Sequence, residues 1–86
     1  MLYRVEFKPP AERAFRGLPR AVQKRIRQHI DALGENPRPP GARKLAGSED
    51  LWRIRVGDYR VVYTIRDDIL LLLVVRVAHR REVYRG

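Results

Sequence analysis

Apolar and polar residues alternate along two short runs in the second half of the chain. These runs, residues 51–56 and 59–65, are separated only by Gly57 and Asp58. Glycine at the first position of a two-residue loop is typical of a type II′ turn, so the runs are predicted to form a β-hairpin. Because a two-residue loop pairs its flanking residues directly, the register is fixed. The predicted pairs are Val56 with Tyr59, Arg55 with Arg60, Ile54 with Val61, Arg53 with Val62, and Trp52 with Tyr63.

The two faces of this hairpin differ in chemistry, since successive side chains of a strand point to opposite sides. One face carries Arg53, Arg55 and Arg60. Arg55 stands directly opposite Arg60, and like charges in that position cost about 0.2–1 kcal/mol. Such a group is expected where an anion binds, because guanidinium donors match phosphate oxygens; a solvated basic surface is the alternative. The other face is apolar and must be covered by the rest of the chain; it carries Trp52, Ile54, Val56, Tyr59, Val61 and Tyr63.

The first half of the chain predicts one strand and two helices. Residues 2–7 alternate as a strand does, and Pro9 is well placed to open a short amphipathic helix that runs to about Gly17. Residues 20–33 carry an apolar stripe at helical spacing, and Gly34 is expected to end that helix. The two helices are predicted to form a helical hairpin whose apolar side covers the apolar face of the β-hairpin.

The remaining segments complete a sheet. Residues 42–45 are a candidate lead-in strand, and Asp67-Asp68 is expected to be a second tight turn. Residues 69–77, apolar on both sides, are typical of a central strand. A tight turn would place Arg66 opposite Ile69 and Arg60 opposite Val75.

The expected fold is therefore α+β: an N-terminal strand, a two-helix hairpin, then a three-stranded antiparallel meander, with the helices packed on one face of the sheet. At 86 residues the chain is expected to be a single domain over residues 1–86.

Charge and composition point to a polyanionic partner. The chain has 19 Lys and Arg against 10 Asp and Glu, a formal net charge of +9, and it has no cysteine. An excess of this kind is typical of nucleic-acid binding, while a membrane surface or an acidic protein are the other partners it fits. The absence of cysteine excludes disulfides and fits a reducing compartment. The longest apolar run, residues 69–75, is too short to span a membrane, so we expect a cytoplasmic protein.

The side chains available for chemistry at the predicted site are cationic. The sequence places no carboxylate pair on the arginine face, no Ser-His-Asp set and no ligand cluster for a metal, so no metal or small-molecule cofactor is expected. An all-basic site suits RNA, because the 2′-hydroxyl of RNA is itself the nucleophile. A protein can then cleave RNA by aligning it and stabilising the charged phosphorus intermediate.

The chain resembles a known family along nearly its whole length. Trp-Arg-Ile-Arg-Val-Gly-Asp-Tyr-Arg-Val-Val-Tyr, followed by Val-Ala-His-Arg-Arg-Glu-Val-Tyr, is similar to the RelE branch of the RelE/ParE toxins of type II toxin–antitoxin pairs. The resemblance implies an α+β toxin that is a ribosome-dependent endoribonuclease, an mRNA interferase. It would cleave mRNA in the A site of the 30S subunit, leave a 2′,3′-cyclic phosphate and inhibit translation. It also implies a cognate acidic antitoxin as partner.

The same resemblance implies roles for individual residues. Arg53 and Arg55 match two basic strand positions, Arg60 matches the phosphate-holding arginine, and either Arg80 or Arg81 matches a general acid. Tyr84 matches a tyrosine that stacks on or orients the substrate. Arginine is a poor general base. His79 or Tyr84 could help to activate the 2′-hydroxyl, or the activation could be purely electrostatic. The expected catalytic residues are Arg53, Arg55, Arg60, Arg80 and Tyr84, and the expected RNA-binding residues are Lys44, His79 and Arg81.

Two other functions fit the sequence. A ParE-like toxin of the same fold poisons DNA gyrase, and its hallmark would be absence of the basic and tyrosine set. The second is an RNA-binding module without catalysis.

Overall fold

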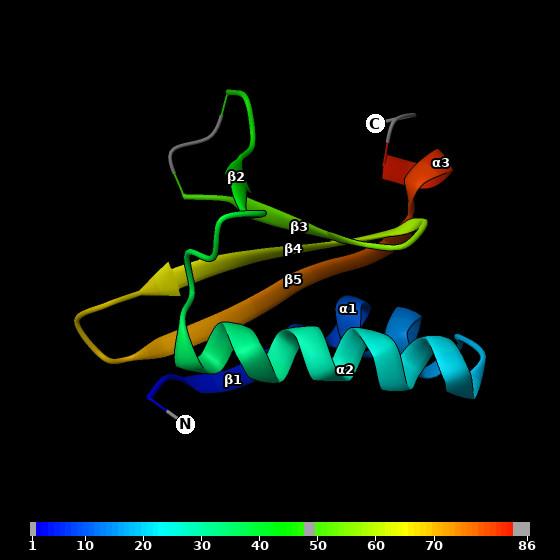
Figure 1. The fold of residues 1–86 in the computed structure, drawn as a ribbon, viewed down its shortest axis with the longest axis horizontal. Helices are drawn as coiled ribbons and strands as arrows, with labels where there is room; N and C mark the ends of the chain where they lie inside the picture. The colour runs from blue at the N-terminus through cyan, green and yellow to red at the C-terminus, as the bar shows by residue number, and fades with distance from the viewer. Residues whose placement is uncertain (1, 48–49, 84–86) are drawn as a thin grey trace.

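A computed structural model describes residues 2–47 and 50–83. Its elements, in chain order, are β1 (Arg4–Phe7), α1 (Pro9–Arg16), α2 (Arg20–Glu35), β2 (Arg43–Lys44), β3 (Trp52–Val56), β4 (Tyr59–Arg66), β5 (Leu71–His79) and α3 (Arg80–Val83). The strands form one sheet in the order β1-β5-β4-β3-β2, with β1 parallel to β5 and the other pairs antiparallel. Helices α1 and α2 cover one face of this sheet (Figure 1).

This architecture is the expected α+β fold with a larger sheet. The meander and the N-terminal strand are present, and the two long helices lie on the same face, as predicted. Residues 43–44 add a fifth strand at the edge, which turns the candidate lead-in into part of the sheet. None of the described helices is long and apolar enough to cross a membrane.

The core lies between α2 and the covered face of the sheet. Ile26, Ile30 and Leu33 form the buried stripe of α2, and they pack against β-strand residues that include Val61 and Leu72. Gly34 does not end this helix, because α2 continues to Glu35. The carbonyl of Gly34 instead accepts a hydrogen bond from the backbone N–H of Tyr3 at 2.9 Å, so the start of the first strand satisfies this end of the helix.

The hairpin register predicted from the turn is confirmed at every pair. Trp52 lies opposite Tyr63, Arg55 opposite Arg60, and Val56 opposite Tyr59. Gly57 has a φ of 60°, the left-handed conformation that a type II′ turn demands of its first central residue. The turn chemistry of two residues therefore sets which side chains share a face.

The register predicted between β4 and β5 is wrong. Arg66 pairs with Leu71 rather than Ile69, because the connection spans residues 67–70 and is not a two-residue turn. A β-bulge between Val62 and Tyr63 shifts the pairing again, so Arg60 lies opposite Ala78 rather than Val75. These two irregularities decide which residues at the end of β5 face the arginines.

The loop after β4 is held by a cluster of polar groups. The hydroxyl of Tyr3 donates a hydrogen bond to Oδ1 of Asp67 at 2.5 Å, and the guanidinium of Arg38 donates to both carboxylate oxygens of Asp67 at 3.3 and 2.8 Å. These bonds, first from Arg38 and then from Tyr3, lower the pKa of Asp67 below its ordinary value of 3.8. The cluster thus joins the N-terminal segment, the loop after α2 and the loop before β5.

We predict that this cluster stabilises the fold only where Asp67 is ionised. A group whose pKa is lowered by folding contributes stability above its unfolded pKa, and loses that contribution as the pH falls through the folded pKa. Asp67→Asn should therefore be less stable than the parent at pH 6, and the difference should shrink progressively as the pH falls below about 3.8. Urea unfolding at both pH values measures this. Asp68→Asn is the matched control, and an equal effect of both substitutions would contradict the assignment.

Candidate functional site

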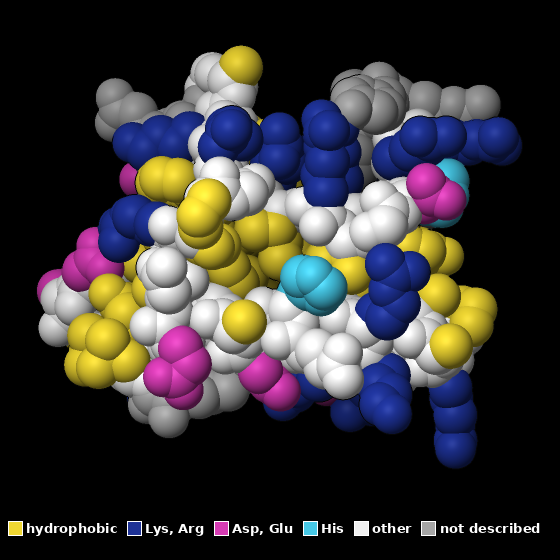
Figure 2. All heavy atoms as spheres, in the orientation of Figure 1, with side chains coloured by type: hydrophobic (Ala, Val, Ile, Leu, Met, Phe, Trp, Pro, Cys, Tyr) yellow, Lys and Arg dark blue, Asp and Glu magenta, His cyan; other side chains and the backbone are white. Residues whose placement is uncertain are grey.

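Arg53, Arg55 and Arg60 lie on the face of the sheet that the helices leave open. Arg53 and Arg55 extend from β3, and Arg60 extends from β4, where it stands opposite Arg55. In Figure 2, Lys and Arg side chains form a row along the side of the sheet away from α2. The arginine face predicted from period two is therefore present as one surface.

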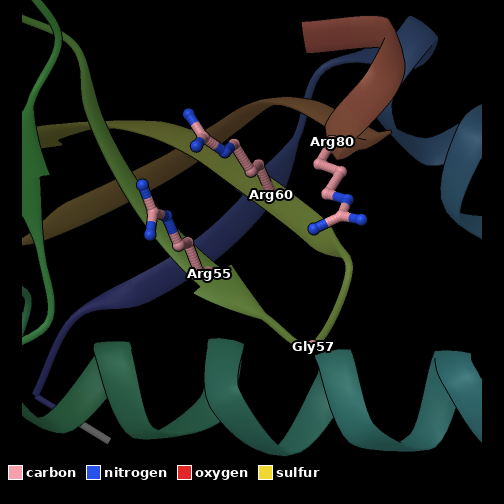
Figure 3. Close-up of a pocket in the computed structure, with 4 residues that line it drawn as sticks. All are labelled: Arg55, Gly57, Arg60 and Arg80. Carbon is pink, nitrogen blue, oxygen red and sulfur yellow. The ribbon is translucent and has the colours of Figure 1, made fainter. Parts of the chain in front are cut away.

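Three arginines line a small cavity on this surface. Arg55, Arg60 and Arg80 surround it together with Gly57, and its volume is about 150 Å³. That is several times the roughly 30 Å³ that a water molecule occupies in the liquid. The three side chains come from β3, β4 and α3 and stand on the same side of the hairpin (Figure 3). The cavity thus offers guanidinium groups from three elements to one small anion.

Arg60 is the most buried of these cations, with only 7% of its surface exposed. Its pKa is lowered from the ordinary arginine value, first by burial and then by the positive charges of Arg55 and Arg53. An anion beside this guanidinium would relieve both effects, because an opposite charge favours the charged form.

Arg53 extends the positive surface toward the edge of the sheet. It is half-buried, and its pKa is lowered by burial, then by Arg55 and then by Arg43. Arg43, on β2, pairs directly with Arg53. Sequence reasoning missed Arg43, although an antiparallel pairing of residues 43–44 with 52–53 would have found it.

Lys44 lies apart from the arginines. It pairs with Trp52, whose side of β3 faces the helices, and its Nζ is 5.6 Å from the centre of the indole ring. The guanidinium of Arg38 lies at the same distance from that ring. The structure therefore places Lys44 in a cation–π contact on the opposite side of the sheet from the predicted site.

The turn of the hairpin positions Arg80. The backbone N–H of Arg80 donates to the carbonyl of Asp58 at 2.7 Å, and Nε of Arg80 is 3.9 Å from Oδ1 of Asp58. Arg81, the next residue, is exposed and does not line the cavity. Of the two arginines that the sequence left open as general acid, only Arg80 is brought to the group.

His79 faces away from the arginine cavity. The register places it opposite Tyr59 on the helix side of the sheet, and the two rings meet edge to face with centroids 5.3 Å apart. Its Nδ1 accepts a hydrogen bond from the backbone N–H of Arg81 at 3.3 Å. Tyr84 lies outside the described residues. Over residues 2–47 and 50–83, no three His, Asp or Glu side chains gather as metal ligands.

Comparison with known proteins identifies the family. A family model described as the ParE toxin of the type II toxin–antitoxin system parDE matches residues 5–84. The chain belongs to this toxin family. Its curated relatives carry RelE names: it is 26% identical to a protein of Methanocaldococcus jannaschii assigned as toxin RelE1, over 100% of this chain and 99% of the relative. It is 33% identical to a RelE-like toxin of Escherichia coli, over 93% of this chain and 85% of the relative.

Solved structures of RelE proteins share the fold. The archaeal RelE–RelB complex from Pyrococcus horikoshii OT3 superposes with a TM-score of 0.81 at 32% identity, covering 93% of this chain and 97% of that one. The isolated RelE toxin of Escherichia coli gives a TM-score of 0.80 at 25% identity, with 96% and 97% covered. The protein is thus a toxin of the RelE/ParE family.

For this RelE/ParE-family toxin we predict that Arg60→Met does not lower the free energy of unfolding. Methionine fills similar space without a charge, so the substitution removes both the burial of a charge and the repulsion from Arg55 and Arg53 that lower the pKa of Arg60. Urea unfolding at low and high salt measures the effect. High salt should stabilise the parent more than the variant, since it screens the repulsion from Arg55 and Arg53.

The exposed neighbour provides the control for this prediction. Arg55→Met should change stability little, because its side chain is already in solvent. If Arg60→Met lowers the free energy of unfolding by more than about 2 kcal/mol while Arg55→Met does not, the fold itself compensates the charge of Arg60.

Proposed function

We propose that this toxin is a metal-independent endoribonuclease, an mRNA interferase, that cleaves mRNA in the ribosomal A site and so inhibits translation. The observation that carries the proposal is the convergence of Arg55, Arg60 and Arg80 on one cavity, with Arg53 beside it. Forked guanidinium donors suit the oxygens of a phosphodiester. The RelE names of the similar proteins support a RelE-like toxin, the class to which this proposed activity would belong.

The arginines would act on the phosphate during transesterification. The 2′-oxygen attacks the adjacent phosphorus while the bond to the 5′-oxygen breaks, which leaves a 2′,3′-cyclic phosphate and a 5′-hydroxyl. Negative charge on the phosphoryl oxygens increases in the transition state, and Arg55 and Arg60, which line the cavity, would stabilise it. Arg53 adds a third positive charge close to the same centre. Alignment of the RNA on this fixed surface supplies the remaining acceleration.

Proton transfer assigns roles to the C-terminal residues. Arg80, held on Asp58 at the rim of the cavity, would protonate the departing 5′-oxygen. His79 lies on the other face of the sheet, which argues against it as the base. Tyr84 is the remaining titratable candidate for accepting the proton of the 2′-hydroxyl and for orienting the base. Without it, activation of the 2′-oxygen would be purely electrostatic.

A cognate acidic antitoxin would regulate the enzyme in the cytoplasm. The net charge of +9 favours encounter with an acidic segment. Leu71, Leu73 and Val75 remain partly exposed on β5, and an added strand or helix could bury them. RelE proteins from archaea and bacteria have been solved in complex with RelB partners.

A second candidate function follows from the matched family model, which is described by the name of the ParE toxin. A ParE-like toxin poisons DNA gyrase and has no need of an arginine cavity that receives a phosphodiester. The retained group of Arg55, Arg60 and Arg80 therefore favours RNA cleavage.

We predict that purified toxin added to translating ribosomes cleaves mRNA at A-site codons, and that Arg60→Ala lowers the rate about 10²–10³-fold. The reduction is expected because removing one pre-oriented donor to a developing negative charge has an effect of that size. Mapping of the cleaved ends by primer extension measures it. Lys24→Ala, which removes one exposed positive charge from α2, is the matched control and should cleave at the parent rate.

The same preparation separates the alternatives. Inhibition of gyrase supercoiling with intact mRNA would support the ParE-like function. Binding of RNA with neither effect would leave an RNA-binding module. Full activity of Arg60→Ala would contradict the site.

A further inference from the structure

Arg43 shares the face of the catalytic arginines but lies outside their cavity. It stands opposite Arg53 across the β2–β3 pair, so both side chains point to the side away from the helices. Its neighbour Lys44 points to the other side, against Trp52. The positive surface therefore continues from the cavity to the edge strand through Arg53 and ends in Arg43.

The Arg43 side chain is held in place by its own loop. Its Nη1 donates to the carbonyl of Pro40 at 2.9 Å and to that of Ala42 at 3.1 Å. Among the described residues these are the only hydrogen bonds of the Arg43 guanidinium, and a guanidinium has five N–H donors. Nε and Nη2 of Arg43 thus remain available to a ligand while Nη1 fixes the group.

No described carboxylate neutralises this end of the surface. Within residues 2–47 and 50–83, no ion pair involves Arg43, Arg53 or Arg55. Burial, then the positive charge of Arg55 and then that of Arg43, lower the pKa of Arg53. Guanidiniums held close together in this way gain from an anion that lies among them.

Arg43 stands well away from the cavity along the sheet. Adjacent strands are about 4.8 Å apart and residues advance about 3.3 Å along a strand. The Cα of Arg43 is therefore about 8 Å from that of Arg55 and about 12 Å from that of Arg60. Nη1 of Arg43 is fixed on the Pro40 carbonyl, and Arg43 does not line the cavity of Arg55, Arg60 and Arg80, so its guanidinium would meet a different anion.

We propose that Arg43 binds a second backbone phosphate of the same RNA strand, next along the chain from the phosphate in the cavity, with Arg53 between the two. The proposal rests on the proposed function, since it assumes that RNA lies on this face. It gives the toxin a two-phosphate track that runs from α3 across the hairpin to β2. Arg43 then aligns the strand and takes no part in the chemistry.

Binding of a short single-stranded RNA with 2′-O-methyl groups, which cannot be cleaved, tests this track. Affinities are measured by fluorescence anisotropy over a series of salt concentrations. Arg43→Gln should weaken binding about threefold to tenfold and should reduce the slope of log K against log salt by about 0.7, the loss of one phosphate contact in a single strand. Lys24→Gln removes the same charge from the helix face and should leave the slope unchanged.

Lys44→Gln tests the register itself. It removes one charge from the adjacent position on the opposite face, so its loss of affinity should be smaller than that of Arg43→Gln. A larger loss in Lys44→Gln, or an Arg43→Gln variant that matches Lys24→Gln, would overturn the proposal. An Arg43→Gln variant that keeps its RNA affinity but loses affinity for an acidic antitoxin peptide would assign Arg43 to that partner and overturn it as well.

A series of RNAs with one neutral methylphosphonate linkage each locates the two phosphates. When the neutral linkage is the one that Arg43 contacts, the parent and Arg43→Gln should bind that RNA with equal affinity, because the contact is already lost. Arg60→Ala should match the parent when a different linkage is neutral. If both variants match the parent at the same linkage, Arg43 and Arg60 contact the same phosphate, and the track is contradicted.

These binding measurements need no cleavage. RNA bound through Arg43 by a protein that cuts no mRNA would therefore support the track and reject the nuclease function. Cleavage of mRNA on ribosomes, together with RNA binding that Arg43→Gln leaves unchanged, would support the nuclease function and overturn the track.

Discussion

The two-residue turn at Gly57-Asp58 is the constraint on which the arginine cavity depends. Its left-handed glycine fixes the hairpin register, and that register alone puts Arg55 opposite Arg60. The same turn holds the backbone N–H of Arg80 on the carbonyl of Asp58, so the third arginine is positioned by the loop that aligns the first two. A slip of one residue would send the arginines into the core and the apolar residues into solvent.

Concentrating positive charge on this face costs the fold stability. Burial and neighbouring guanidiniums lower the pKa of both Arg53 and Arg60, which means that their charged forms are disfavoured where they stand. The core between α2 and the sheet, with Ile26, Ile30 and Leu33 fully buried, offsets this cost from the other face. The two sides of the sheet thus differ: one stabilises the fold, and the other carries arginines whose charged forms their surroundings disfavour.

Sequence reasoning succeeded where local chemistry determines structure and failed where it does not. The hairpin register followed from one glycine, and the α2 stripe followed from helical periodicity. The β4–β5 register could not be predicted, because a bulge at Val62 and Tyr63 and a longer loop leave no clear signal in the sequence. That error concealed the orientation of His79. Likewise, only the pairing of β2 with β3 shows that Arg43, and not Lys44, shares the arginine face.

The central claim is that arginines holding an RNA phosphate suffice for cleavage because the RNA supplies its own nucleophile. The most direct measurement uses translating ribosomes programmed with mRNA that carries a single 2′-deoxynucleotide at the A-site position normally cut, in the presence of EDTA at a level the ribosomes tolerate. The account predicts that normal mRNA is cut there, with a 2′,3′-cyclic phosphate at the new end, and that the substituted mRNA stays intact at that position. Cleavage of the deoxy-substituted linkage at the normal rate would contradict it.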